Sequence, residues 1–246
     1  MSRTFTVMTY NIHSSIGMDG KISPQRIAEV IDQCNPDIVA LQELDSGLVR
    51  TEMTDQAHLI ALTLNMTYHF HSSILLEDGE YGNAVLSRFP IRLVKAGAVP
   101  IEPYNECCER RGAIWTEIEV NGRKLQLIAT HLGLNRNERF AQTEAIMGPE
   151  WLSHPYCRNP VILCGDFNAL PASPVYRRIT AYLNDAQRSF KERRPRATWP
   201  VRFPILRIDH LFHSPDIKVH NVMVPKNPLT RIASDHLPLV VALEFL

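Results

Sequence analysis

The run Val161–Cys164 constrains the fold more than any other segment, because it is apolar at every position and stops at Gly165. Such a short apolar run is typical of a strand buried on both faces, which requires further layers on either side of its sheet. Asp166 and Asn168 follow the glycine and are expected at the carboxyl end of the strand, where ligand sites of layered α/β proteins gather. Ser234-Asp235-His236 adjoins another apolar run in the same way.

The first part of the chain reads as a β-α-β unit over residues 5–43. Strands are expected at 5–10 and 37–43, joined by a loop and a helix. Ser23 and Pro24 suit the N-cap and the first position of that helix. The remaining strands are predicted at 67–74, 82–87, 91–99, 113–120, 123–130, 160–164, 208–213, 217–224 and 237–244, and the remaining helices at 54–64, 136–147 and 174–183.

Antiparallel pairs and crossover helices are mixed along the whole chain. Asn121-Gly122 is typical of a type I′ hairpin turn, and no Pro/Gly/Ser-rich linker divides the sequence. We therefore expect a single domain over residues 1–246, of the α/β or α+β class, with sheets inside and helices outside. The Arg- and Pro-rich segment 187–207 is expected to be a long surface loop.

Composition limits the function classes. The 246 residues include 26 basic and 26 acidic side chains, which disfavours tight sequence-independent DNA binding through the net charge. The five cysteines show no zinc-binding spacing or disulfide framework, and Cys107 and Cys108 are expected to be reduced thiols in a loop. No signal peptide and no apolar run of about 18 residues is present. These features predict a soluble cytoplasmic protein without stable membrane insertion.

Polar residues at predicted strand ends carry the chemistry. They supply carboxylates, amides and imidazoles, which suit a hard cation such as Mg²⁺ acting on a phosphate. No serine or cysteine nucleophile stands in a recognisable motif, and no phosphate-binding P-loop occurs. The residues in question are Asn11, Glu43, His131, Asp166, Asn168, Asp209, Asp235 and His236.

Seven short motifs occur in a fixed order over residues 9–239. They are Thr9-Tyr10-Asn11-Ile12-His13, Leu41-Gln42-Glu43, Gly82-Asn83 with Ser87-Arg88-Phe89-Pro90, Thr130-His131-Leu132, Gly165-Asp166-Phe167-Asn168, Arg207-Ile208-Asp209-His210 and Ser234-Asp235-His236-Leu237-Pro238-Leu239. Taken together they resemble the endonuclease/exonuclease/phosphatase superfamily. The resemblance implies a DNase I-like four-layer α/β sandwich, with two packed mixed β-sheets flanked by helices.

The resemblance also implies roles for single residues. Glu43, Asn11 and Asp235 correspond to residues on the metal side of the family's site. Asp166 corresponds to the aspartate that orients or activates the attacking water, and Asn168 to the amide that holds the phosphate.

Three further residues complete the implied catalytic set. His236 corresponds to the histidine beside the scissile phosphate and Asp209 to the carboxylate that orients it. His131 corresponds to a second histidine that can protonate the leaving group. Whether His236 acts as base, acid or phosphate stabiliser stays open at this point.

Substrate contacts are expected from Asn83 and from one of the adjacent arginines Arg110 and Arg111. The basic and aromatic residues of 187–207, including Trp199 and Phe203, fit a substrate-facing loop and a solvated loop equally well. The remaining histidines are expected to be structural.

The favoured function is a Mg²⁺- or Mn²⁺-dependent phosphodiesterase or nuclease that uses an activated water and forms no covalent intermediate. Its substrate is a phosphoester, with nucleic acid and a phospholipid headgroup as candidates. The alternatives are a phosphomonoesterase on a small or lipid-linked phosphate (phosphatase or sphingomyelinase-like) and a non-catalytic binding module. Substrate identity, metal number and oligomeric state stay open.

Overall fold

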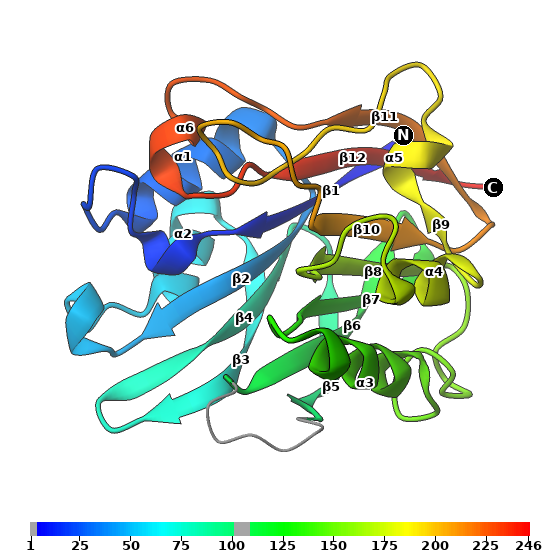
Figure 1. Cartoon of the computed structure of the whole chain (residues 1–246), viewed down its shortest axis with the longest axis horizontal. Coiled ribbons are helices and arrows are strands. Elements are labelled where there is room, and N and C mark those ends of the chain that lie inside the picture. Colours follow the sequence, from blue (N-terminus) through cyan, green and yellow to red (C-terminus); the bar gives the residue numbers. More distant parts are fainter. Residues whose placement is uncertain (1–3, 101–108) are drawn as a thin grey trace.

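The computed structural model describes residues 4–100 and 109–246, so the predictions for Cys107 and Cys108 lie outside the described residues. Two six-stranded sheets pack face to face, with helices on their outer faces (Figure 1). The first sheet has the strand order β11-β12-β1-β2-β4-β3, and the second has the order β5-β6-β7-β8-β10-β9.

The strands are β1 (Thr4–Asn11), β2 (Ile38–Ser46), β3 (Thr67–Leu76), β4 (Gly79–Ser87), β5 (Ile91–Val99), β6 (Arg111–Val120), β7 (Arg123–His131), β8 (Val161–Asp166), β9 (Asn184–Asp185), β10 (Asp209–His213), β11 (Ile217–Met223) and β12 (Leu239–Phe245). The α-helices are α1 (Pro24–Cys34), α2 (Gln56–Leu64), α3 (Arg136–Met147), α4 (Pro174–Thr180), α5 (Ala186–Ser189) and α6 (Thr230–Ala233), and two 3₁₀ helices cover His13–Ser15 and Val49–Thr51.

Both sheets are mixed, as predicted. β1 pairs in parallel with β2, and β7 pairs in parallel with β8, whereas the other paired strands run antiparallel. Each parallel pair encloses a crossover helix, α1 in the first sheet and α3 in the second. Each sheet therefore contains one β-α-β unit, whose two strands end at the same edge.

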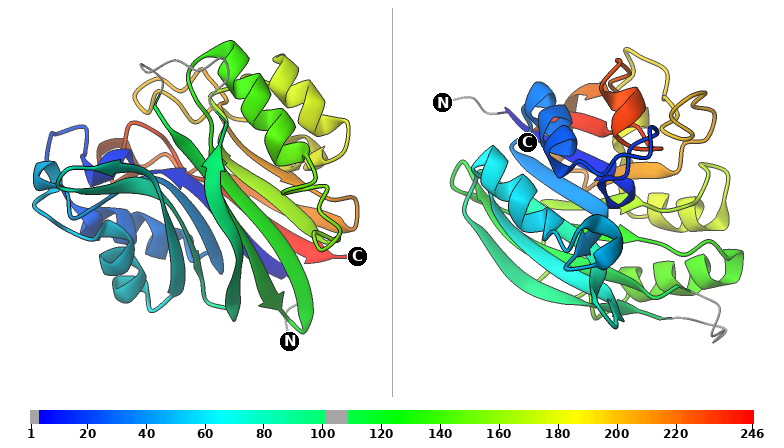
Figure 2. Two further views of the ribbon diagram at one scale, coloured as in Figure 1. Left: turned by 90° about the horizontal axis from the view of Figure 1, so that it is seen from below. Right: turned by 90° about the vertical axis from the view of Figure 1, so that its left-hand side faces the viewer.

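Alternating side chains along the strands build three apolar layers. Ile162 and Cys164 of β8 join the core between the two sheets, whereas Leu163 faces the layer beneath α3 and α4. In β1, Val7 faces the other sheet and Met8 packs under α1 and α2. Burial on both faces explains the continuously apolar strands. Figure 2 shows the helices outside the two sheets, which confirms the predicted four-layer sandwich.

Two local predictions are confirmed in detail. The Ser23 side chain accepts a hydrogen bond from the Arg26 N–H at 3.2 Å and caps α1, with Pro24 in its first turn. Asn121 and Gly122 have φ angles of 53° and 79° between β6 and β7, as a type I′ turn requires.

The segment 187–207 differs from its prediction as a surface loop. Its start belongs to α5, and Trp199 pairs with Leu206 through an isolated β-bridge. Thr198 and Val201 are fully buried, and Val201 joins the core between the sheets. The buried residues Thr198 and Val201 were not predicted, because the many Arg and Pro residues around them are typical of an exposed loop. The helix predicted at 174–183 ends earlier, at Thr180. Within the described part of the chain, no helix is long and apolar enough to cross a membrane.

Candidate active site

Three site residues lie side by side because of strand register in the second sheet. In the parallel pair β7–β8, His131 stands opposite Asp166. In the antiparallel pair β8–β10, Asp166 stands opposite Asp209. Asp166 therefore lies on β8 itself, at the centre of a row of three polar side chains contributed by adjacent strands.

Gly165 allows this row to form. Its φ angle is +143°, and a Cβ at this position would lie 1.8 Å from the backbone oxygen of Thr130 on β7. A side chain here would push β8 away from β7 and separate Asp166 from His131. Glycine is thus required by the close approach of two backbones, one residue before the carboxylate.

The first sheet supplies the opposite side of the site. Asn11 ends β1, and Glu43 lies at a bulge in β2, with a φ angle of +61°. Such strained backbone in a non-glycine residue is enriched at functional sites. The Asn11 amide donates to Glu43 Oε1 at 2.8 Å and to Asp166 Oδ2 at 3.1 Å, so it links the two sheets.

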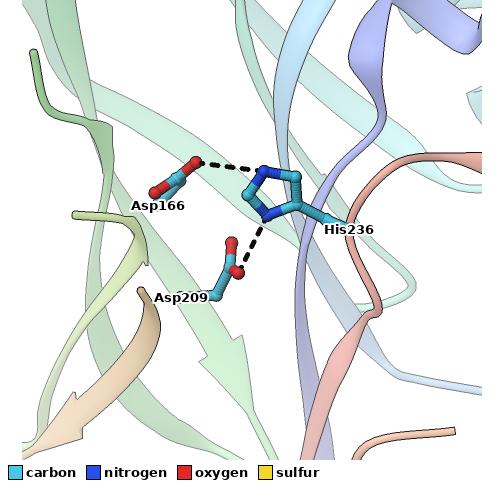
Figure 3. A group of neighbouring side chains, drawn as sticks. All are labelled: Asp166, Asp209 and His236. Carbon is cyan, nitrogen blue, oxygen red and sulfur yellow. Dashed lines mark hydrogen bonds and ion pairs between the residues drawn. The ribbon is translucent and has the colours of Figure 1, made fainter. Parts of the chain in front are cut away.

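The segment before β12 brings His236 into the same place. The Ser234 hydroxyl donates to the backbone oxygen of Asn11 at 2.8 Å, which fixes this segment against the end of β1. His236 Nδ1 lies 3.0 Å from Asp209 Oδ2, and its Nε2 lies 3.7 Å from Asp166 Oδ2 (Figure 3). The imidazole thus bridges two carboxylates, as predicted for Asp209 and His236.

These contacts determine the charge of the pair. Burial alone lowers the pKa of His236, but the charge and hydrogen bond of Asp209, together with Asp166, raise it to about 10. Burial and the nearby Asp209 carboxylate raise the pKa of Asp166 to about 7, against the opposing effect of His236. His236 therefore carries a positive charge at neutral pH, and Asp166 is poised to take up a proton.

His131 has the opposite charge state. Burial and the positive charge of Arg111 hold its pKa well below the usual value. Arg111 Nη1 donates to His131 Nδ1 at 3.0 Å, which leaves the proton of the neutral ring on Nε2. That nitrogen lies 3.6 Å from Asp166 Oδ2 and 3.9 Å from Glu43 Oε1.

Asn168 is held in a tight turn directly after β8. Its φ angle is +47°, and its backbone N–H donates to Asp166 Oδ1 at 2.8 Å. The side-chain amide donates to the backbone oxygen of Leu132 at 2.9 Å and lies 3.2 Å from His131 Nε2. The turn therefore fixes the amide beside both His131 and Asp166.

A cavity of about 850 Å³ opens over these residues. Most of the residues predicted from sequence line it: Glu43, Arg111, His131, Asp166, Asn168, Asp235 and His236. Asn11 and Asp209 are buried and support the lining residues from behind.

Two predicted phosphate contacts lie elsewhere. Asn83 is buried and donates to the backbone oxygen of Gly112 at 3.4 Å, next to Arg111. Arg110 is exposed and does not line the cavity. Of the two adjacent arginines, Arg111 enters the site, where it also pairs with Glu109 at 2.5 Å.

Sequence reasoning missed the support that the segment 187–207 gives to the site. The fully buried Thr198 hydroxyl donates to Asp209 Oδ2, and the Trp199 indole donates to Asp235 Oδ2 at 3.1 Å. The sequence indicates Trp199 as an aromatic residue of the basic segment 187–207, but no sequence signal marks Thr198.

The donor set fits a hard divalent cation. Carboxylate oxygens of Asp166 and Asp209 lie within 4.8 Å of each other and of the His236 ring, and one Asn11 amide serves carboxylate oxygens of both Glu43 and Asp166. Asp209 Oδ1 is buried without a hydrogen-bond partner among the described residues. Mg²⁺ and Mn²⁺ prefer carboxylate oxygens as ligands. Here such oxygens are clustered, and protein hydrogen-bond donors satisfy them only in part.

Comparisons with known proteins agree with this geometry. YbhP of Escherichia coli strain K12 is 28% identical over 250 residues, which cover 96% of this chain and 94% of YbhP. The crystal structure of an endonuclease/exonuclease/phosphatase from Beutenbergia cavernae superposes with a TM-score of 0.76 at 25% identity, covering 99% of this chain and 72% of that one. A mannosyl-6-phosphatase from Bacteroides thetaiotaomicron shares the fold, with a TM-score of 0.73 at 19% identity over 98% of this chain and all of its own.

The family comparison covers the whole site. Residues 8–236 match the sequence model described as the Endonuclease/Exonuclease/phosphatase family, a span that runs from β1 to His236. The chain therefore belongs to the endonuclease/exonuclease/phosphatase family of hydrolytic phosphoesterases.

Proposed function

We propose that the chain is a Mg²⁺- or Mn²⁺-dependent phosphodiesterase that cleaves by direct attack of water. The proposal rests on the cluster of Asp166, Asp209 and His236, of which Asp166 and His236 line an open cavity and Asp209 supports His236 from behind. Glu43, with Asp166 beside it, would hold the cation, and Asn11 would orient both carboxylates. When bound, the cation supplies positive charge that polarises a phosphate oxygen.

The side chains divide the remaining work. Asp166, with its raised pKa, orients the water and accepts its proton. His236, held in its charged form by Asp209, faces the phosphate and stabilises the negative charge of the transition state. Asn168 and Arg111 bind the phosphate oxygens. No nucleophilic side chain is required.

Charge balance favours a diester over a monoester. A phosphomonoester dianion needs more compensating positive charge than a diester monoanion. Of the two arginines among the described lining residues, Arg111 is partly neutralised by Glu109 even where it binds the phosphate, and Arg139 is the other. Apolar side chains, among them Trp199, Leu206 and Ile208, form another wall and suit the organic substituent of a diester.

The phosphomonoesterase stays as the alternative. The mannosyl-6-phosphatase from Bacteroides thetaiotaomicron carries a phosphatase name on the same fold. A non-catalytic binding module is the least supported possibility, since Glu43, Asp166 and His236 are all present around one cavity.

A phospholipid headgroup is the second candidate substrate, and one observation favours it. Phe203 and Ile205, in the short turn between Trp199 and Leu206, are 77% and 76% exposed. Exposed apolar side chains beside a cavity suit contact with a lipid surface. A nucleic-acid substrate would instead bind with a steep dependence on salt. Two measurements distinguish these substrates. Sedimentation with phospholipid vesicles would indicate a lipid surface, and oligonucleotide binding that weakens steeply with salt would indicate nucleic acid.

We also propose that the protein works in the cytoplasm. The proposal rests on Cys34, Cys157 and Cys164, which are free thiols in the described part of the chain.

The decisive experiment compares hydrolysis of bis(p-nitrophenyl) phosphate and p-nitrophenyl phosphate with Mg²⁺, with Mn²⁺ and with EDTA. We expect metal-dependent cleavage of the diester, reduced about 10²–10⁴-fold by Asp166→Asn because the proton acceptor is lost. Circular dichroism of the variant controls for folding. Cleavage of the monoester alone would replace the proposal by the phosphatase, and a folded Asp166→Asn variant at the wild-type rate would refute the site assignment.

A further inference from the structure

A second, smaller cavity adjoins the active site. It has a volume of about 330 Å³ and lies between the first turns of α3 and α4. Arg139 and Ser173 line both cavities, so the two hollows meet at these side chains. The other lining residues are Arg136, Asn137, Phe140, Pro174 and Val175. Among the described residues, two arginines and no carboxylate therefore line this space.

The position of Arg139 is fixed by the loop after β7. Its Nη1 donates to the backbone oxygens of Gly133 and Leu134, at 3.3 Å in the case of Gly133. This loop directly follows His131, so the guanidinium is held at a constant place relative to the catalytic centre. Within residues 4–100 and 109–246, no carboxylate pairs with Arg139, and its side-chain hydrogen bonds use Nη1 alone.

The electrostatic surroundings of Arg139 favour a bound anion. Burial lowers its pKa, Glu138 and Asp166 raise it, and Arg136 lowers it again. Arg139 is thus partly withdrawn from water, within the field of the catalytic carboxylate on one side and of a second cation on the other. An anion between Arg136 and Arg139 would relieve their repulsion and replace lost hydration by charge-assisted hydrogen bonds.

We propose that Arg136 and Arg139 form a subsite for a second phosphate group of the substrate, next to the scissile phosphate. The substrate class is then a phosphoester that carries a further phosphate within the same molecule, as in a chain of phosphodiesters or a bisphosphate. This inference rests on the proposed function only in placing the first phosphate at Asp166 and His236.

Alkanediol phosphates test the proposal. The bisphosphates of propane-1,3-diol to octane-1,8-diol and the matching monophosphates are compared as inhibitors of bis(p-nitrophenyl) phosphate hydrolysis at saturating Mg²⁺. We expect a bisphosphate of suitable length to bind about tenfold more tightly than its monophosphate, the scale of one charge-assisted contact. Arg136→Gln and Arg139→Gln should each abolish this ratio, and Arg139→Lys should retain part of it.

Arg231→Gln, on the exposed surface of α6, is the matched control and should keep the wild-type ratio. Equal inhibition by monophosphates and bisphosphates at every length would overturn the proposal, as would Gln variants that weaken both inhibitors equally. Calorimetric titration of the same compounds gives the ratio without turnover. A protein that hydrolyses neither test ester but retains the ratio would therefore contradict the proposed function and support the subsite.

Discussion

His131 and His236 are both buried at the candidate active site, yet their neighbours give them opposite charge states. Burial, together with the positive charge of the Arg111 guanidinium that donates to it, keeps His131 neutral, whereas the Asp209 carboxylate keeps His236 charged by accepting from it. Identical side chains thus take different chemical roles because one faces a donor and the other an acceptor.

The charge on His236 gives a pH dependence of stability that can be measured. Its folded-state pKa of about 10 lies above the unfolded value of about 6.5, so its stabilising contribution is complete below pH 6.5 and is lost as the pH rises through 10. In EDTA, the difference in free energy of unfolding between wild type and His236→Gln should shrink from pH 6 to pH 10. Urea denaturation at several pH values measures it, and a constant difference would contradict the assigned pKa.

Thr198 offers a test of how Asp209 is held. In Thr198→Val the shape of the side chain is kept, but Asp209 loses a hydrogen-bond donor that is fully buried. We expect a loss of about 1–3 kcal/mol in unfolding free energy and a fall in kcat of about tenfold, since His236 is less firmly oriented. Thr198→Ser retains the hydroxyl and should stay near wild type in both measurements. Wild-type kcat in the Val variant would show that Asp209 needs no such support.

Residue identity was the part of the site most accessible from sequence, because Asp166, Asn168, Asp209 and His236 stand at the ends of recognisable apolar runs. Asn83 shows what residue identity alone does not reveal about the site. Its place in the motif Gly82-Asn83 suggested a phosphate contact, but its side chain donates to the backbone oxygen of Gly112. Side-chain direction depends on the packing of β4 against β6, and local sequence carries little information about it.

At the level of elements, the site lies where two β-α-β units meet. β1 and β2 deliver Asn11 and Glu43, and β7 and β8 deliver His131 and Asp166. The parallel pairs belong to different sheets, and the Asn11 amide connects their ends through Glu43 and Asp166. The first unit was evident from sequence as 5–43. The second was not, since β7 also pairs with β6 in a hairpin that dominates the local pattern.

The approach of β8 to β7 is tested by Gly165→Ala. The added Cβ would collide with the Thr130 oxygen and meet an unfavourable backbone conformation, so we expect a loss of about 3–5 kcal/mol in unfolding free energy. Gly122→Ala is the matched control, because Gly122 also has a positive φ angle (+79°) but an added Cβ would meet no atom within 4 Å. It should cost only about 1–2 kcal/mol. Chemical denaturation measures both, and equal losses would exclude the backbone collision.

At the level of the whole molecule, the two sheets share one core and the site draws residues from both. The ordered motifs over residues 9–239 resemble a known family. That resemblance predicted the four-layer architecture, which the helix and strand patterns alone did not specify. The helix and strand patterns of the sequence predicted most elements, but they contained no information on which face of each sheet packs against the other sheet. Pairing of β1 with β12 depends on contacts between the two ends of the chain, unlike the local hairpin of β6 and β7.

A shared core predicts one cooperative folding unit over residues 1–246. Far-UV circular dichroism and tryptophan fluorescence should give the same urea midpoint, because Trp115 and Trp151 report on the second sheet while Trp199 reports on the catalytic segment. The His236→Gln variant should shift both signals together. Two separated transitions would instead indicate that the sheets unfold independently.

The pairing of the first strand with the last has a consequence during protein synthesis. Asn11 and Ser234 meet in the finished molecule, but the ribosome makes them on the order of tens of seconds apart at about 5–20 residues per second. Until His236 emerges, a nascent chain holds carboxylates and amides but lacks the charged imidazole that faces them. On the proposed mechanism, protein fragments that lack this segment would be inert toward phosphoesters, so translation itself would delay hydrolysis until folding is nearly complete.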